Sequence, residues 1–226
     1  FPARSRRLSS SPTMDQPLAG LESNIDALRE CGQIFWQRGW SVGTSSNYSA
    51  VISRDPVELL VTASGMDKGR LSREDFVRVG EEGTPVVEGQ PKSSAETMLH
   101  VMLARRDDVG AILHTHSVWA TVLSDMFASD GGFEINGYEM LKGLEGVKTH
   151  EHVEYVPIFE NTQAIPALAD EVEDRLFTGK TDFIHGFLIR QHGLYTWGRT
   201  VDEARRHVEI YEFLFEVLFR KLQLGR

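Results

Sequence analysis

The sequence has a single cysteine, Cys31, among 226 residues. One thiol forms no intrachain disulfide, so the fold depends on its hydrophobic core, and we expect a reducing, cytoplasmic environment. Cys31 lies in a helical pattern with Ile34 and Phe35 nearby. That setting is typical of a small buried hydrophobic side chain rather than of a nucleophile.

The sequence also lacks long apolar runs and an excess of basic residues. No run approaches the roughly 18 apolar residues of a membrane span, so we expect a soluble protein with no membrane partner. The 33 acidic and 24 basic residues give a formal net charge of −9. We expect no nucleic-acid partner, because counterion release requires a basic face. A small anionic substrate is still compatible, since it needs only a local group of donors.

The composition that is present suits one domain. Hydrophobic residues make up 41% of the chain, and residues 18–226 contain no internal repeat and no linker, so we expect them to form a single domain. Residues 1–17 differ, because the first twelve are basic and serine-rich and contain no acid. We interpret 1–17 as a disordered or processed segment, such as an extension before Met14, although an organelle transit peptide has the same composition.

Hydrophobic periodicity predicts an α/β protein. Helices are expected at 18–36, 93–106, 118–126, 163–177 and 201–221. Strands are expected at 50–53, 58–62, 76–79, 85–88, 111–117, 153–159, 183–189 and 194–198. Residues 139–143 are expected to form one helical turn. The last helix has more aromatic residues than one buried stripe needs, which indicates a subunit interface unless they all enter the core: Tyr211, Phe213, Phe215 and Phe219.

A histidine pair follows a short apolar run, in the sequence Ala111-Ile112-Leu113-His114-Thr115-His116. Alternate residues of a strand point to the same face, so both imidazoles would meet at one point. Two converging imidazoles form part of a zinc site. An isolated His-x-His is weak evidence, however, because either ring can simply form a hydrogen bond.

A catalytic zinc ion takes three protein ligands, so a third ligand is needed from another segment. His192 follows a predicted strand and precedes Gly193, whose lack of a side chain lets the backbone approach a ligand closely. His152 is the next candidate, but it lies in a polar stretch that we expect at the surface. The residues alone favour His192 only modestly.

Two small-residue loops, 43–49 and 63–69, could expose backbone N–H groups and hydroxyls to a phosphate, although they are equally well explained as ordinary loops. A predicted helix begins just after Ser93 and Ser94, and helix N-termini also favour phosphate. Ser93 and Glu96 match the Ser-x-x-Glu capping box. Capping and catalysis are therefore rival interpretations of Glu96.

Several motifs together resemble the class II aldolase/adducin superfamily: Gly43-Thr44-x-x-Asn47-x-Ser49, Ser64-Gly65-Met66-Asp67-Lys68, Ser94-Ala95-Glu96, His114-Thr115-His116-Ser117 and Gln191-His192-Gly193. Three further segments resemble the methylthioribulose-1-phosphate dehydratases within it: residues 139–143, 157–162 and 192–198. The resemblance covers nearly all of 28–222. It implies a three-layer α/β/α fold around a mostly antiparallel sheet.

The resemblance implies one zinc ion per subunit on His114, His116 and His192, with Glu139 as general acid/base. It also implies a homotetramer with active sites at subunit interfaces. The expected reaction is dehydration of 5-methylthioribulose 1-phosphate, a small sugar phosphate, to 2,3-diketo-5-methylthiopentyl 1-phosphate in methionine salvage. Neutral donors suit a phosphate in so acidic a protein, and we expect it on Asn47, Ser64, Gly65 and Ser94, and less firmly on Thr44 and Lys68.

At position 96 this chain departs from some of the dehydratases, and this difference leaves a second reaction class open. Some of the dehydratases have a cysteine where this chain has Glu96, whereas the sugar-phosphate aldolases have their catalytic glutamate there. This chain has both Glu96 and Glu139, so an aldolase or epimerase remains possible, with Glu139 expected to be essential and Glu96 secondary. A non-enzymatic, adducin-like binding module is a remote alternative, because the three histidines and an acid are all present.

Overall fold

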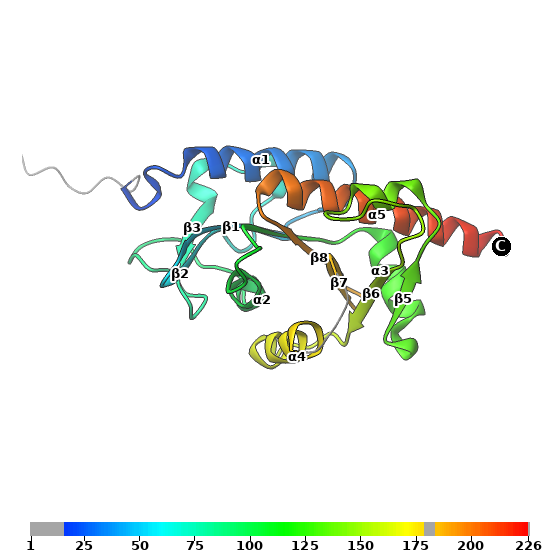
Figure 1. Ribbon diagram of the computed structural model, residues 1–226. Helices are drawn as coiled ribbons and strands as arrows, with labels where there is room; N and C mark the ends of the chain where they lie inside the picture. The colour runs from blue at the N-terminus through cyan, green and yellow to red at the C-terminus, as the bar shows by residue number, and fades with distance from the viewer. Residues whose placement is uncertain (1–15, 179–183, 226) are drawn as a thin grey trace, which may run out of the picture.

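The computed structural model describes residues 16–178 and 184–225. The predicted segment 1–17 therefore lies almost entirely outside the described residues. Three layers are seen edge-on in Figure 1, with α1 and α5 over one face of the sheet and α2 and α4 under the other. The α/β/α fold with a central sheet is confirmed. Within the described ranges, no helix is both long enough and apolar enough to cross a membrane.

Eight strands form one sheet in the order β3-β2-β1-β4-β8-β7-β6-β5. All neighbouring pairs are antiparallel except β6 and β7, as expected for a mostly antiparallel sheet. The strands are β1 (Asn47–Arg54), β2 (Val57–Thr62), β3 (Phe76–Val79), β4 (Ala111–Thr115), β5 (Gly132–Ile135), β6 (Glu154–Phe159), β7 (Gly186–Ile189) and β8 (Gly193–Gly198). β4 lies near the middle, between β1 and β8.

Five α-helices cover the sheet in the described part of the chain. They are α1 (Glu22–Gln37), α2 (Thr97–Ala104), α3 (Val118–Met126), α4 (Ile165–Phe177) and α5 (Val201–Gln223), with short 3-10 turns that include η5 (Glu139–Gly143). Gly39 follows α1 with a positive φ of 74°, a conformation that glycine adopts without strain. The Thr200 side chain accepts the Glu203 N–H at the start of α5.

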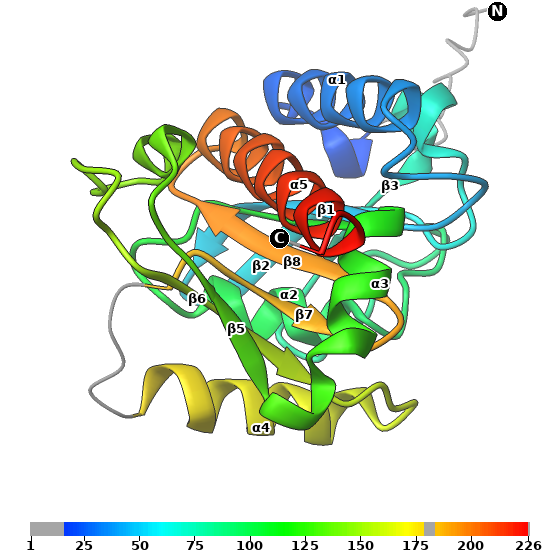
Figure 2. The same ribbon diagram turned by 90° about the vertical axis from the view of Figure 1, so that its right-hand side faces the viewer.

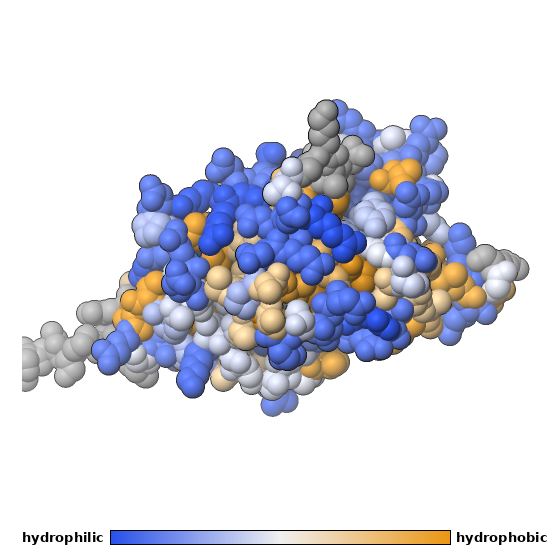
Figure 3. All heavy atoms as spheres, turned by 90° about the horizontal axis from the view of Figure 1, so that it is seen from below, coloured by the Kyte–Doolittle hydropathy of each residue, from blue (hydrophilic) through white to orange (hydrophobic). Residues whose placement is uncertain are grey.

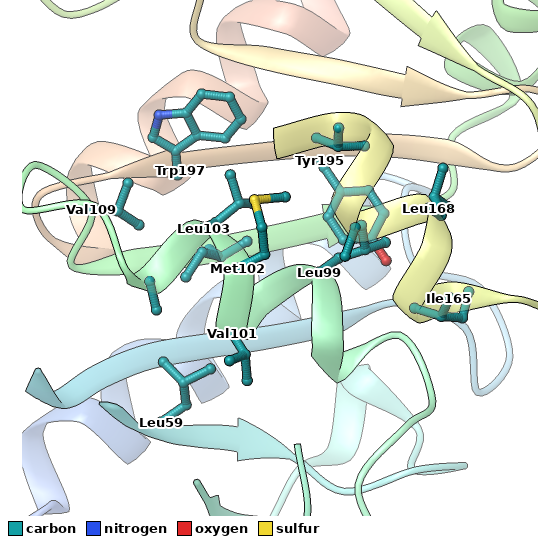
Figure 4. Close-up of a cluster of buried hydrophobic side chains, with 14 of the residues drawn as sticks. Leu59, Leu99, Val101, Met102, Leu103, Val109, Ile165, Leu168, Tyr195 and Trp197 are labelled. Carbon is teal, nitrogen blue, oxygen red and sulfur yellow. The ribbon is translucent and has the colours of Figure 1, made fainter. Parts of the chain in front are cut away.

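Each face of the sheet has its own apolar core. On the α2/α4 side, aliphatic residues of both helices meet β2, β4 and β8, and Figure 4 shows Leu99, Met102, Leu168 and Tyr195 among them. On the other side, α1 and the start of α5 cover β1 and β4, while α3 and the rest of α5 cover β5 to β8. Figure 2 shows α5 lying across the sheet. Seen from the α4 side, the surface is mostly hydrophilic with scattered apolar residues (Figure 3).

Several expectations about local structure were wrong or incomplete. Residues 85–88 form no strand, and only an isolated bridge joins Pro85 to Val79. β5 was not expected. β7 begins at Gly186, so residues 184 and 185 of the predicted strand 183–189 are not part of it, and residue 183 lies outside the described residues. The interpretation of Glu96 is described with the site below.

The subunit interface on α5 stays a prediction. Tyr211 and Phe215 are buried in the core, whereas Phe213 is 45% exposed.

Candidate metal centre

β4 brings His114 and His116 together at its carboxyl end. His114 pairs with Asn47 of β1 and with Tyr195 of β8, so it faces the α2 side of the sheet, where its ring stacks on that of Tyr195 at 4.0 Å. Thr115 points to the opposite side and donates to Glu212 of α5. The His116 ring returns to the His114 face, and the two Nε2 atoms are 2.7 Å apart.

His192 comes from the turn between β7 and β8. Gln191 has a positive φ of 52° in this turn, and a Cβ on Gly193 would lie 2.0 Å from the Thr115 carbonyl oxygen. The glycine therefore lets the turn press against the end of β4. His192 Nε2 lies 3.3 Å from His114 Nε2. The rival candidate His152 instead bonds Glu154.

The protonation pattern of these rings suits a metal ion. His114 Nδ1 lies 2.8 Å from the Leu194 carbonyl oxygen, so this nitrogen carries the proton and Nε2 presents its lone pair. Burial and the neighbouring histidines lower the pKa of His114 far below its usual range and that of His116 to about 4. Neutral imidazoles are the form that coordinates metal. Among the described residues, His114, His116 and His192 are the one group able to hold an ion in this way.

Glu96 lies directly beside these histidines. Its Oε1 is 3.0 Å from His192 Nε2, and its Oε2 is 3.9 Å from His114 Nε2. Burial would raise the pKa of the Glu96 carboxyl, but the hydrogen bond and charge of His192 outweigh burial and hold the pKa below its usual range. Glu96 does not close a capping box: it occupies the N-cap position of α2 without a side-chain cap bond, and Ser93 donates to the Gly83 carbonyl. Of the two rival interpretations of Glu96, the capping box does not form, and the carboxylate lies beside His114 and His192.

A chain of buried polar groups orients this carboxylate. Asn47 Nδ2 donates to Glu96 Oε2 at 2.7 Å, so its Oδ1 is free to accept from His100 Nε2. His100 Nδ1 then accepts from the Ser49 hydroxyl at 2.8 Å. Asn47 and Ser49 are alternate residues of β1, so they share the face that α2 covers. Sequence reasoning missed His100 and Ser49; the alternation in 47–49 was the available signal.

The phosphate-binding role of the predicted residues stays a prediction; Asn47 begins β1 and bonds Glu96. Thr44, Ser64 and Gly65 are exposed, and a Cβ on Gly65 would meet open space. Ser94 Oγ accepts the Glu96 N–H at 3.3 Å. Lys68 is buried, and its ammonium group donates to the Met66 carbonyl. Burial lowers the pKa of Lys68 to about 8. Its hydrogen bond to Met66 lies within its own loop.

In the described part of the chain, Glu139 does not contact His114, His116 or His192. It begins η5, its side chain is 68% exposed, and it forms ion pairs with Lys142 at 2.5 Å and His150 at 3.2 Å. These partners lower the pKa of the Glu139 carboxyl, Lys142 more than His150. Gly143, at the other end of η5, packs against Ile210 of α5. Of the two predicted acids, the fold therefore places only Glu96 beside the metal centre of the same chain.

Comparison with known families decides the class of this protein. The model of the class II aldolase and adducin N-terminal domain matches residues 26–219. The chain belongs to this family. Within the class II aldolase family, its curated relatives include the methylthioribulose-1-phosphate dehydratase of Marinobacter nauticus, 46% identical over 198 residues that cover 87% of this chain and 93% of the relative. The dehydratase of Pectobacterium atrosepticum is 48% identical over 183 residues, covering 80% and 85%.

Solved structures agree on the fold. YgbL of Escherichia coli, described as a putative aldolase/epimerase/decarboxylase, superimposes with a TM-score of 0.72 at 23% identity and covers 88% of this chain and 90% of its own. The L-fuculose-1-phosphate aldolase of Thermus thermophilus gives 0.67 at 24% identity, covering 89% and 96%. At this level of identity the likeness concerns the class II aldolase architecture and not the reaction.

Proposed function

We propose that this class II aldolase family protein is a zinc-dependent methylthioribulose-1-phosphate dehydratase of methionine salvage that acts in the cytoplasm. The observation that carries the proposal is the set of relatives of that name at 44–48% identity, which the chain matches over most of their length. The geometry supports it, because three imidazoles converge beside the Glu96 carboxylate, whose pKa is lowered. An adducin-like module would need neither.

The proposed metal is zinc, one ion per subunit, held by His114, His116 and His192. When bound, such an ion supplies Lewis-acid polarisation of a ketone and the adjacent hydroxyl. The chain prepares two of the three nitrogens in advance: the Leu194 carbonyl fixes the tautomer of His114, and burial lowers the pKa of His116 to about 4. A site preorganised in this way holds its ligands without further rearrangement.

Dehydration removes the C3 proton and the C4 hydroxyl of the sugar as one molecule of water. A base takes the C3 proton, an acid protonates the departing C4 hydroxyl, and the resulting enol becomes the second ketone. We propose that Glu139 performs both transfers in turn, because a carboxylate that has taken a proton can return it as an acid. We assign the phosphate to Asn47, Ser64, Gly65 and Ser94, with Thr44 and Lys68 as further candidates.

This assignment requires a site shared between subunits. Glu139 is exposed on its own chain and is paired there with Lys142 and His150. We propose that the protein is a homotetramer in which Glu139 of one subunit reaches the histidines of another. Phe213, exposed on α5, is one apolar side chain available for such packing.

Glu96 supports a second candidate, a sugar-phosphate aldolase or epimerase. It is the acid that lies beside the histidines of its own chain. Retro-aldol cleavage needs a base at the C4 hydroxyl proton and breaks the C3–C4 bond. From the same substrate it would release dihydroxyacetone phosphate and a two-carbon methylthio aldehyde, whereas dehydration leaves the carbon chain whole.

The test is a product analysis with the zinc-loaded protein. 5-Methylthioribulose 1-phosphate and a panel of other ketose 1-phosphates are incubated with it, and diketone is measured against released aldehyde. Diketone from the methylthio sugar alone supports the dehydratase. Aldehyde as the main product, from any member of the panel, replaces it with the aldolase. Purified protein that retains no divalent metal and turns over no substrate would instead support the binding module.

A further inference from the structure

A second group of buried ionisable side chains lies away from the metal centre, between β6, β7 and α5. At its middle is Glu154, which is fully buried. Its Oε1 accepts the Tyr211 hydroxyl at 2.5 Å, and its Oε2 accepts His152 Nε2 at 2.8 Å. His185 Nδ1 lies 3.1 Å from both oxygens. Burial would raise the pKa of the Glu154 carboxyl, but His185 and the hydroxyl outweigh it and lower the pKa.

His185 in this group carries a proton on each ring nitrogen. Nδ1 faces the Glu154 carboxylate, and Nε2 lies 2.8 Å from the Glu145 carbonyl oxygen. Both neighbours are acceptors only, so both nitrogens must donate, which makes the ring an imidazolium. Burial opposes this charge, but Glu154 and the Glu145 carbonyl overcome it and raise the pKa of His185.

His207 of α5 has the opposite pattern. Its Nδ1 lies 2.7 Å from the Trp197 carbonyl oxygen and therefore carries the proton. Its Nε2 is left as an acceptor, and it takes the Glu145 N–H at 3.0 Å. Burial lowers the pKa of His207 to about 4, in agreement with a neutral ring. One charged and one neutral histidine thus hold the carbonyl and the N–H of the same residue, Glu145.

Glu145 follows η5 by two residues, and η5 begins with Glu139. The rest of this segment is held by apolar contacts: Leu141 and Leu144 are buried, and Gly143 packs against Ile210. Apolar contacts are non-directional, whereas two opposed hydrogen bonds fix a backbone position and its register. A buried ion pair is weak evidence for stability, because apolar residues of similar size often serve as well. The arrangement therefore points to placement rather than to stability.

We propose that Glu154, His185 and His207 are positioning residues of the dehydration: they hold the Glu145 backbone and thereby fix η5 with Glu139 at the subunit surface. The inference rests on the proposed function. General acid/base transfer requires hydrogen-bond reach, about 2.6–3.2 Å between heavy atoms, and a displacement of about 1 Å can cost on the order of 100-fold in rate. A loosened Glu145 would produce such a displacement.

The central experiment compares His207→Leu with His207→Gln, both zinc-loaded. Leucine removes the acceptor for the Glu145 N–H, whereas the side-chain oxygen of glutamine can restore it. We expect His207→Leu to lower kcat by about 10-fold or more with KM nearly unchanged, and His207→Gln to recover most of the loss. His185→Gln, which leaves Glu154 without its charged partner, should lower kcat at least as much. If the variant at His185 fails to fold, the variants at His207 still test the proposal, and the reverse also holds.

Combination with Glu139→Gln separates placement from a general loss of structure. If His185 and His207 act through Glu139, adding His207→Leu to Glu139→Gln should lower kcat little further. The control is Arg175→Gln, which removes the bonds of Arg175 to the Ile158 and Gly131 carbonyls and is expected to leave kcat unchanged. Unchanged kcat in metal-replete His207→Leu and His185→Gln, or losses that multiply with that of Glu139→Gln, would overturn the proposal.

Hydrogen exchange keeps this test separate from that of the proposed function. Amides 139–147 should exchange faster in His207→Leu than in Arg175→Gln, whatever the substrate. If the wild type dehydrates nothing, the proposed function fails, and faster exchange in 139–147 still supports the placement of η5. Unchanged exchange there overturns the placement. Faster exchange with full dehydratase activity also overturns the proposal, because the looser segment would then not matter to the reaction.

Discussion

Glu96 Oε1 lies 3.0 Å from His192 Nε2, and the other oxygen of that carboxylate accepts the Asn47 amide. The bond joins the start of α2 to the turn between β7 and β8. It brings one negative charge to three imidazoles, and burial lowers the pKa of two of them, His114 and His116. A divalent cation entering this centre would therefore meet imidazole donors and one compensating charge, a donor set that suits zinc.

Removing one imidazole should remove the metal. We expect His114→Gln and His192→Gln to retain less than about 0.1 zinc ion per chain and to lose dehydratase activity, because a catalytic zinc ion needs all three protein ligands. Elemental analysis of the dialysed proteins measures this. The matched control is His152→Gln, which alters the other histidine weighed as a ligand and should keep its zinc. Full occupancy in His192→Gln would exclude His192 as a ligand.

The two glutamates should differ in their effect on rate. Glu139→Gln should lower kcat of the dehydration by about 10²–10⁴-fold, the usual contribution of a general acid/base, with metal content unchanged. Glu96→Gln should lower kcat less, because Glu96 is not the residue that transfers protons in this proposal. The glutamine amide can still lie beside His192. Steady-state kinetics with 5-methylthioribulose 1-phosphate checks both. Near-normal turnover in Glu139→Gln together with loss of turnover in Glu96→Gln reverses the assignment and favours the aldolase-type site.

The parts of the site that follow from local pattern were predictable. His114 and His116 are alternate residues of a strand, so their convergence follows from strand geometry. The glycine after His192 indicated a close approach of the backbone, and Gly193 does press against Thr115. Most helices and strands also follow from hydrophobic periodicity, with errors at element boundaries, one predicted strand at 85–88 that does not form and one strand, β5, that was not predicted.

The parts that depend on distant packing were not predictable. Glu96 matched a capping box, but its carboxylate contacts Asn47 and His192, which come from other elements. Tertiary contacts outweighed the local motif there. His152 lies in a polar stretch and was expected at the surface, yet its Nε2 bonds the buried Glu154. In both cases the decisive partner lies outside the local sequence window.

Glu212 should make stability depend on pH. It is buried behind β4, and burial raises its pKa from 4.5 to about 7, although Ser117 and Thr115 partly oppose the rise. Between these values the folded state binds more protons than the unfolded state, so stability falls as pH rises from 4.5 to about 7. The full loss is about 3 kcal/mol, at about 1.4 kcal/mol for each pH unit.

Glu212→Gln removes this loss and retains an oxygen for the Thr115 hydroxyl. We expect the variant to match the wild type near pH 4 and to be more stable by about 3 kcal/mol near pH 8. Urea unfolding of the metal-free proteins measures the difference, since bound metal would add its own stabilisation. Glu216→Gln, one turn further along α5, is the control and should show no such trend. A difference that stays constant from pH 4 to 8 contradicts the prediction.

The shared site makes a prediction that needs two inactive proteins. Glu139→Gln retains the histidines, and His114→Gln retains Glu139, so each lacks a different half of the proposed site. If Glu139 of one subunit serves the histidines of another, a mixed oligomer contains some sites with both halves intact. After random reassociation of equal amounts, roughly one quarter of the sites have both halves intact, so the mixture should recover roughly one quarter of wild-type activity. The mixture is dissociated in mild denaturant, reassembled with zinc and assayed, and each variant treated alone is the control. If the mixture stays as inactive as its components although hybrid oligomers have formed, Glu139 serves its own chain, and the site closes by a movement of η5 rather than by assembly.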